Sequence, residues 1–232
     1  MSEAMPIMAA AWGPAPFRPD RQAPQARAWL GERTIRAVDV AVALLALVMA
    51  FPVLLLIALV IRASGSGPVV FAHRRVGRGG RPFRCLKFRT MAVDADQRLK
   101  ALLEADPVAR EEWARTQKLR TDPRVTWYGG FLRRSSLDEL PQLVNVLRGE
   151  MSLVGPRPIV ESEIPRYGRH FAIYCSVKPG LTGLWQVQRS HDTSYRRRIA
   201  FDVAYARSRS VPLNLRIIAL TVPTVLLGRG AC

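Results

Sequence analysis

The sequence predicts an α+β, predominantly helical fold that is attached to a membrane, and three observations lead to this prediction. Residues 40–61 read VAVALLALVMAFPVLLLIALVI and contain no charged side chain. Residues 69–76 and 82–88 are rich in β-forming residues and are separated by glycines, which indicates a small β-hairpin. Residues 94–105 and 108–118 have helical character with charged faces, which indicates two surface helices split at Pro107.

Length, charge and cysteine content limit the class of protein. The 232 residues suffice for one domain with a real core and appendages. A net charge of +17 predicts anionic partners, which could be nucleic acid, anionic lipid or phosphorylated small molecules. Cys85, Cys175 and Cys232 are widely separated and lack histidines at metal-ligand spacing. Neither a disulfide framework nor a zinc site is therefore predicted, and a reducing compartment fits best.

The N-terminal part divides into an arm and a membrane segment. Residues 1–32 contain several prolines and scattered arginines but no apolar core of signal-peptide type, so a disordered arm is expected. The 22 residues of the apolar run can cross a hydrocarbon core of about 30 Å. Fifteen of them are Leu, Ile, Val or Phe, which together favour lipid by about 5 to 9 kcal/mol.

The path of this segment through the membrane depends on Pro52 and on the flanking arginines. Pro52 lacks an N–H and its ring collides with the carbonyl of Val48, so a kink is expected. Arginines flank both ends, and the positive-inside rule predicts that both flanks lie in the cytoplasm. A hairpin that enters and leaves by one face and a kinked single span therefore both remain open. Residues 211–227 are apolar but interrupted by prolines and polar residues, which suits a helix lying in the membrane interface.

Two adjacent carboxylates, Asp138 and Glu139, lie in the segment SSLDELPQLVNVLRGEMSLVGPRP at residues 135–158. Ser136 and Glu139 match a capping box, but that register places Pro141 in a helix interior. With Asp138 as the N-cap, Pro141 falls in the first turn, so this register is favoured. A helix N-terminus favours ionised carboxylates, which are usable nucleophiles, and it also attracts phosphate.

Several basic residues accompany this acidic pair in short stretches punctuated by glycine and proline: Lys87, Arg89, Arg133, Arg134 and Arg157. Arginine offers bidentate contacts to phosphate oxygens, so the collection suits a pyrophosphate. A carboxylate could also hold Mg²⁺, the usual companion of phosphoryl transfer. The ordinary explanations of the same residues are a helix start and a solvated or lipid-facing basic surface.

Three segments closely resemble the bacterial sugar transferase family, the small monotopic phosphoglycosyl transferases that initiate glycan assembly on polyprenyl phosphate. They are KFRTM at residues 87–91, SLDELPQLVNVLRGEMSLVGPRP at residues 136–158, and KPGLTGLWQV at residues 178–187. The similarity covers roughly residues 33–228. Within the family, the chain looks most like the short enzymes that initiate exopolysaccharide synthesis, which are often galactose-1-phosphate transferases.

The resemblance implies a two-step reaction. Asp138, at the position of the family's nucleophile, would attack the sugar-bearing phosphate of a UDP-sugar, release UMP and hold a covalent phospho-sugar. Polyprenyl (undecaprenyl) phosphate would then take the phospho-sugar. Glu139 matches the family's Mg²⁺-coordinating acid, Arg133 and Arg157 would contact phosphates, and Lys87 would assist.

One departure from the family concerns the end of the third segment. The family usually follows Gln and Val with a small residue, Gly and Arg, whereas Gln186 and Val187 are followed here by Gln188, Arg189 and Ser190. Arg189 is the nearest candidate for the role of the missing arginine. Together with Lys87, Arg89, Arg133 and Arg157, it completes the expected set of substrate-binding residues.

The resemblance also implies a topology and a location. The family's apolar segment is a re-entrant hairpin broken at a proline that matches Pro52. Residues 33–62 are therefore expected to form a re-entrant membrane helix, and residues 63–228 a cytoplasmic catalytic domain with interfacial helices at the bacterial inner membrane. The expected partners are a UDP-sugar, undecaprenyl phosphate and membrane lipids, with Mg²⁺ as cofactor and no nucleic acid. The identity of the sugar and a homo-oligomeric state are left open.

Two alternatives explain part of the same pattern. In the first, the substrates are the same, but Asp138 only assists direct attack by the lipid phosphate, so no covalent adduct forms. In the second, the chain is a non-enzymatic, membrane-anchored basic module that docks nucleic acid or anionic lipid by charge. The second alternative accounts for the net charge of +17 but not for the acidic pair.

Overall fold

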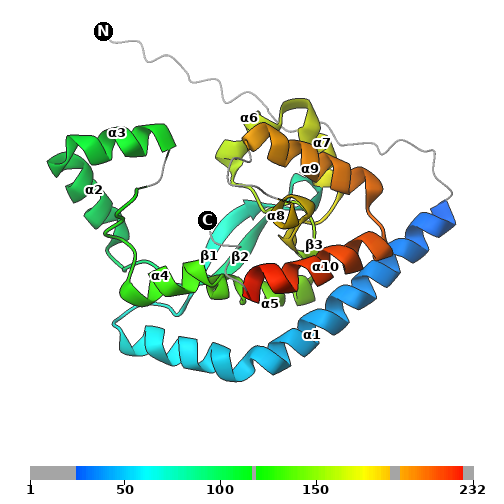
Figure 1. Cartoon of the computed structure of the whole chain (residues 1–232), viewed down its shortest axis with the longest axis horizontal. Helices are drawn as coiled ribbons and strands as arrows, with labels where there is room; N and C mark the ends of the chain where they lie inside the picture. The colour runs from blue at the N-terminus through cyan, green and yellow to red at the C-terminus, as the bar shows by residue number, and fades with distance from the viewer. Residues whose placement is uncertain (1–24, 117–118, 189–193, 227–232) are drawn as a thin grey trace, which may run out of the picture.

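The computed structural model describes residues 25–116, 119–188 and 194–226. In chain order its elements are α1 (Gln25–Ala63), β1 (Val70–Val76), β2 (Pro82–Phe88), α2 (Ala95–Ala105), α3 (Pro107–Thr116), α4 (Trp127–Arg134), α5 (Gln142–Arg148), β3 (Ser152–Val154), α6 (Ile164–Tyr167), α7 (Phe171–Ser176), β4 (Gly180–Thr182), α8 (Leu184–Val187), α9 (Tyr195–Ser208) and α10 (Val211–Leu226). Helices dominate and the strands are short, as Figure 1 shows. The predicted α+β, predominantly helical fold is confirmed at this level.

Helix α1 is the longest element and runs along one side of the molecule (Figure 1). Its part from Gly31 to Ala63 is long and apolar enough to cross a membrane, and only 11% of its apolar window is buried. This exposure argues against a core helix of a soluble protein. The helix begins at Gln25, inside the arm expected for residues 1–32, because the helical hydrogen bonding extends beyond the apolar run. Residues 1–24 lie outside the described residues.

Pro52 lies inside α1, and the helix bends partway along its length (Figure 1). The expected kink is therefore present. The helix is continuous through the proline, so the structure shows one bent helix rather than two helices separated by a break. The re-entrant path through a membrane stays a prediction.

The N-terminal half of α1 is held on the rest of the chain by buried polar contacts. Asp39, which is 3% exposed, accepts hydrogen bonds from Ser152 Oγ at 2.7 Å and from the Leu153 backbone N–H at 3.0 Å. One turn earlier, Arg36 donates to the carbonyl oxygens of Val146 and Leu147 at the end of α5. The Val146 carbonyl also accepts from the Gly149 N–H at the end of α5, and the guanidinium adds a positive charge that complements the negative end of this helix.

The C-terminal end of α1 is held in the same way from the other side of the domain. Arg89, at the end of β2, is buried and donates to the carbonyl oxygens of Ile61 at 3.3 Å and Ser66 at 2.6 Å. Between the two attachments, nine large apolar side chains of α1 are more than two-fifths exposed: Leu44, Leu45, Val48, Met49, Phe51, Val53, Leu55, Leu56 and Leu59. Both ends of the apolar helix are thus fixed to one body.

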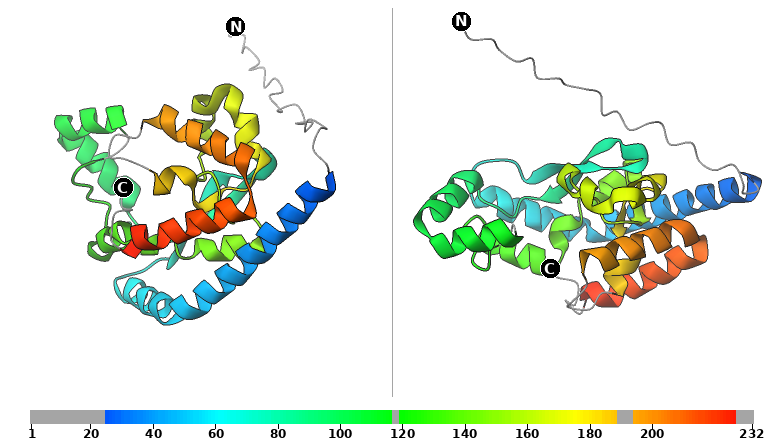
Figure 2. Two further views of the ribbon diagram at one scale, coloured as in Figure 1. Left: turned by 45° about the vertical axis from the view of Figure 1, so that its right-hand side comes forward. Right: turned by 90° about the horizontal axis from the view of Figure 1, so that it is seen from above.

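The predicted hairpin is confirmed, with an antiparallel register from Val70 opposite Phe88 to Val76 opposite Pro82. Gly79 and Gly80 in its turn have φ of 70° and 74°, a conformation that favours glycine. The two predicted surface helices are confirmed as α2 and α3, and Pro107 is the first residue of the second. Figure 2 shows that α2 and α3 form one end of the molecule.

The core is centred on α5, which packs between α1 and the hairpin. Leu143 and Val146 of α5 join Phe83 of β2, Met151 and Tyr205 in one buried cluster. Strands β3 and β4 form a parallel pair in this core, with Ser152 opposite Gly180. Helix α10, the apolar helix near the C-terminus, contacts α1 and covers the same side of the core (Figure 1).

We expect replacement of Asp39 by Ala to destabilise the protein by about 2 to 4 kcal/mol, because the Ser152 hydroxyl and the Leu153 N–H would stay buried without a partner. Chemical unfolding in detergent, followed by tryptophan fluorescence, would measure the change. Asp94→Ala is the matched control, because Asp94 pairs with Arg98 at an exposed site and should cost less than about 0.5 kcal/mol. Equal effects of the two substitutions would contradict this account of α1.

Candidate active site

The acidic pair lies in a tight turn in front of α5. Ser136 has φ of 58°, in the left-handed region, and residues Leu137–Glu139 form one 3₁₀ turn. Helix α5 begins only at Gln142, after Pro141. The predicted N-cap role of Asp138 is therefore wrong. The backbone bonds from Leu140 to Leu137 and from Leu143 to Leu140 are of the shorter 3₁₀ type, so Asp138 points inward from the turn instead of capping α5.

Lys87 of β2 brings the two carboxylates together. Its Nζ lies 2.7 Å from Oε1 of Glu139 and 3.6 Å from Oδ2 of Asp138. Asp138 is 7% exposed, so its carboxylate is largely shielded from water. A cation shared by two partly buried carboxylates interacts with them more strongly than a surface ion pair would.

The two carboxyl groups respond to this environment in opposite ways. Burial is the largest influence on both and raises the pKa of Asp138, where Lys87 opposes it and Glu139 adds to it. For Glu139, burial also acts upward, but the positive charges of Lys87 and Arg157 outweigh it and lower the pKa. The sequence led us to expect both groups to be stabilised as anions. That expectation fails for Asp138, because the turn buries it away from the helix end.

A cysteine also lines the cavity next to Glu139, but it is a poor nucleophile. Burial raises the pKa of the Cys85 thiol to about 11, so the thiol stays protonated at neutral pH. Asp138 is the better candidate nucleophile, because its carboxylate lies beside the Lys87 ammonium, whose charge opposes the effect of burial on its pKa.

Two of the predicted arginines surround the pair. Nε of Arg133 donates to Oγ1 of Thr90 at 3.0 Å, and the charge of Arg133 acts to lower the pKa of Asp138. Arg157 lines the same cavity as Lys87 and Glu139. The structure therefore brings together Lys87, Arg133, Arg157 and the acidic pair, as the sequence predicted.

Arg75 is a site residue that the sequence reasoning missed. It lines the cavity with Lys87 and Arg157, and its guanidinium donates to the Pro158 carbonyl at 3.3 Å. The hairpin register could have revealed it. Residues 71, 73 and 75 lie opposite residues 87, 85 and 83, so Arg75 and Lys87 share one face of the hairpin.

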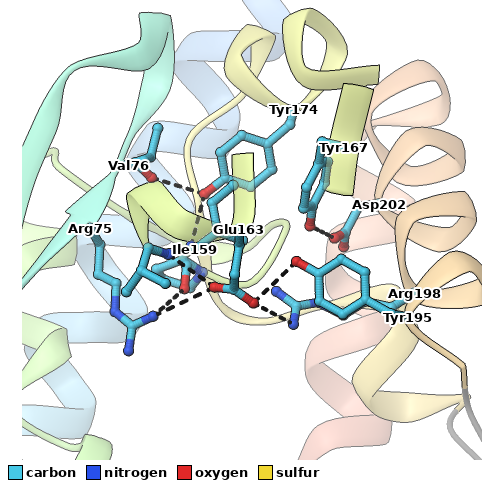
Figure 3. A network of polar contacts seen from close by, with 11 residues as sticks. Arg75, Val76, Ile159, Glu163, Tyr167, Tyr174, Tyr195, Arg198 and Asp202 are labelled. Atoms are coloured by element: carbon cyan, nitrogen blue, oxygen red, sulfur yellow. Dashed lines mark hydrogen bonds and ion pairs between the residues drawn. The ribbon is translucent and has the colours of Figure 1, made fainter. Parts of the chain in front are cut away.

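Glu163 holds Arg75 in place and links it to α9 (Figure 3). Its carboxylate lies 3.9 Å from Nη1 of Arg75 and 3.6 Å from Nη1 of Arg198, and it accepts a hydrogen bond from the Tyr195 hydroxyl at 3.1 Å. The Glu163 carboxylate therefore pairs with the guanidinium groups of both Arg75 and Arg198 near the cavity.

Of the two other predicted binding residues, one lies elsewhere and one is outside the described residues. Arg89 lines a separate cavity of about 700 Å³ between the end of α1 and the start of α4, and it does not line the cavity of Glu139. Its visible role is to bind the carbonyls at the end of α1, and substrate binding by Arg89 stays a prediction. Arg189 lies outside the described residues.

The residues present are compatible with Mg²⁺, although the described residues contain no cluster of three or more acidic, histidine or cysteine ligands. Mg²⁺ is commonly held by one or two carboxylates, with substrate phosphates and waters completing its shell. Asp138 and Glu139 supply two carboxylates beside four cationic side chains that suit phosphate. Lys87 sits on Oε1 of Glu139, so a bound Mg²⁺ would have to displace its ammonium or use the other oxygen. The magnesium site stays a prediction.

Comparisons with known proteins identify relatives of this chain. Residues 31–228 match the model of the family described as bacterial sugar transferase. The exopolysaccharide production protein ExoY of Sinorhizobium fredii is 46% identical over 202 residues, which cover 87% of this chain and 89% of the relative. The UDP-galactose-lipid carrier transferase of Erwinia amylovora is 46% identical, and the undecaprenyl-phosphate galactose phosphotransferase of Salmonella typhimurium is 44% identical. Each of these two matches covers 84% of this chain but only 41% of the longer relative.

We expect replacement of Lys87 by Met to raise the pKa of Glu139, because burial would then act without the nearest positive charge to oppose it. Carbon-13 NMR titration of labelled glutamate side chains would measure this, with Glu139→Gln assigning the signal. Lys100→Met is the control, because Lys100 is 79% exposed and pairs only weakly with Glu104. An unchanged Glu139 titration in Lys87→Met would contradict the assigned role of the lysine.

Proposed function

This chain belongs to the bacterial sugar transferase family, and on that premise we propose that it transfers a sugar-1-phosphate from a UDP-sugar to undecaprenyl phosphate. The names of its relatives support the substrates, since one names UDP-galactose and a lipid carrier and another names undecaprenyl phosphate. The observation that carries the proposal is a buried aspartate, Asp138, held beside Lys87 and Glu139 among phosphate-binding arginines. The proposed product would begin the assembly of an exopolysaccharide or another glycan.

In the first proposed step, Asp138 is the nucleophile. The diphosphate of the UDP-sugar lies among Lys87, Arg75 and Arg157, whose charges offset its own. An oxygen of the Asp138 carboxylate forms a bond to the phosphorus that carries the sugar, while the bond from that phosphorus to the bridging oxygen breaks. UMP leaves with the electron pair of that bond, and an aspartyl phospho-sugar remains.

In the second proposed step, an oxygen of undecaprenyl phosphate attacks the same phosphorus. The bond between phosphorus and Asp138 breaks, which restores the carboxylate and releases undecaprenyl diphosphate-sugar. No general base is needed in either step, because both nucleophiles are already anions. Burial of Asp138 favours this chemistry, since a poorly hydrated carboxylate is a better nucleophile than one exposed to water.

We infer that Asp138 and Glu139 would hold Mg²⁺ when the metal is present. Mg²⁺ would neutralise charge on the diphosphate oxygens. Lys87 would keep the pair together in the absence of the metal, as its contact with Glu139 suggests.

We infer further that α1 enters the cytoplasmic leaflet of the bacterial inner membrane and leaves it on the same side. The support is that both ends of α1 are hydrogen-bonded to one domain, through Asp39 and Arg36 at one end and Arg89 at the other. A helix fixed in this way cannot place its ends on opposite sides of a bilayer unless the domain itself crosses. Its exposed apolar side chains would lie among the acyl chains, and the active site would lie at the interface, where the acceptor's phosphate lies.

Replacement of Asp138 by Asn should abolish the first half-reaction. With radiolabelled UDP-galactose and no acceptor, we expect the wild-type protein to release at most one UMP per site and to retain label. The variant should lose at least about a thousandfold in initial rate and retain no label. Mass spectrometry of the intact protein would locate the phospho-sugar, and the exposed Asp94→Asn variant should behave as the wild type does.

The same experiment separates the alternatives. Single-step transfer predicts product only when undecaprenyl phosphate is present, and it predicts no labelled protein. A basic membrane-anchored module predicts no UMP release at all and no dependence on Asp138. A screen of UDP-galactose, UDP-glucose and their N-acetyl relatives would then identify the sugar.

The proposed topology predicts that both flanks of α1 are accessible only from the cytoplasm. In a Cys232→Ser background, where Cys85 and Cys175 are buried, single cysteines are introduced at the exposed positions Ala37 and Lys100. A membrane-impermeant maleimide should label both positions in inverted vesicles and neither in intact spheroplasts. Labelling of position 37 from the periplasmic side alone would show that α1 spans the membrane.

A further inference from the structure

Unpartnered buried polar atoms gather beside the candidate active site. Among the described residues, six buried side-chain nitrogen or oxygen atoms have no hydrogen-bond partner, and four of the six belong to three residues: Trp185 (Nε1), Gln186 (Oε1) and Arg198 (Nε and Nη2). Folded proteins pair nearly all such atoms, because each unpaired one costs about 1 to 3 kcal/mol. A concentration of them is a place where the polar groups of a ligand or of water complete the hydrogen bonding.

Contacts connect these three residues to the cavity that Lys87, Glu139 and Arg157 line. Gln186 of α8 lines the cavity together with Lys87 and Glu139. Trp185 precedes it and is 8% exposed, and the Arg198 guanidinium lies over the Trp185 ring at 5.5 Å. The other face of this group is fixed by Glu163, which pairs with both Arg198 and Arg75 (Figure 3).

The chemistry of the unpartnered atoms is specific. Trp185 Nε1 and the two Arg198 nitrogens can only donate hydrogen bonds, whereas Gln186 Oε1 can only accept them. Nε2 of Gln186 donates a long hydrogen bond of 3.5 Å to the Leu181 carbonyl, which leaves Oε1 as the unpaired atom of this amide. Trp185 and Arg198 therefore offer hydrogen-bond donors and Gln186 offers an acceptor. The Arg198 guanidinium also lies over the Trp185 ring.

We propose that Trp185, Gln186 and Arg198 bind the uracil of the UDP-sugar, which deepens the proposed function and rests on it. The pairing edge of uracil carries an N3–H donor between the two carbonyl acceptors O2 and O4. Gln186 Oε1 accepts from N3–H, while Trp185 and Arg198 donate to the carbonyls. Bases are commonly read in this way, by hydrogen bonds along the pairing edge beside aromatic rings and arginine planes.

The other parts of the donor substrate fit this group less well. A phosphate carries only acceptors at neutral pH, so it would leave Gln186 Oε1 unpaired. A cytosine presents an acceptor at N3, which would face the oxygen of Gln186. Binding of uracil here also places the diphosphate toward Arg75, because Glu163 joins Arg75 to Arg198.

Calorimetric titration of the full-length protein in detergent with UMP, CMP and 3-methyl-UMP tests the proposal without requiring turnover. We expect the wild type to bind UMP at least about tenfold more tightly than CMP or 3-methyl-UMP, since each analogue removes the N3–H donor. Gln186→Leu should weaken UMP binding about tenfold and bring the ratio of UMP to CMP affinity to about two or less. Trp185→Phe should weaken UMP binding about fivefold to tenfold while the ring stays in place.

The controls separate binding from folding. Trp127→Phe, at a residue 78% exposed on α4, should leave the UMP affinity unchanged. If Trp185→Phe fails to fold, the comparison of UMP with 3-methyl-UMP on the wild type still decides the question. Equal wild-type affinities for these two ligands, or an unchanged UMP preference in Gln186→Leu, would overturn the uracil site while leaving the proposed function standing. Absence of UMP binding together with absence of UMP release from every UDP-sugar would overturn both.

Discussion

The structure depends on the attachment of both ends of one apolar helix to a single domain. At one end, the carboxylate of Asp39 accepts hydrogen bonds from β3, and at the other the guanidinium of Arg89 donates to the carbonyls of Ile61 in α1 and of Ser66 just beyond it. Each is a charged group that would be costly to bury without its partners. The exposed apolar middle of α1 is therefore held at a fixed position relative to Asp138, so in the proposed topology the depth of α1 in lipid would set the height of Asp138.

The segment that contacts the end of α1 also carries a residue of the candidate active site. Strand β2 carries Lys87 two residues before Arg89, so the lysine that holds the acidic pair and the arginine that caps the membrane helix are separated by one residue. Thr90, the next residue, accepts a hydrogen bond from Arg133 on its side-chain oxygen and so connects this segment to α4. A displacement of the helix end in the membrane would thus be transmitted to the carboxylates through a short, hydrogen-bonded segment.

Local patterns in the sequence predicted the elements that depend mainly on interactions between residues close in the chain. The uncharged run predicted α1, the β-forming residues on both sides of the glycines predicted the hairpin, and Pro107 marked the start of α3. The N-cap assignment of Asp138 failed because the left-handed Ser136 and the 3₁₀ turn depend on packing against β2, which no spacing rule contains. Strands β3 and β4 were missed because three-residue strands are stabilised by distant partners. Arg75 was missed because only the pairing register places it on the same face of the hairpin as Lys87.

The charges at the candidate active site do not cancel. Lys87, Arg75, Arg133 and Arg157 bring four positive charges, against which Asp138 and Glu139 set two negative ones. The remainder of two positive charges equals in magnitude the charge of the diphosphate in a UDP-sugar. Repulsion among the cations is consistent with the lowered pKa of Arg75, to which burial contributes most and the neighbouring Arg157 adds. Binding of a dianion would relieve this repulsion, so the two surplus positive charges at this site suit the diphosphate of the proposed substrate.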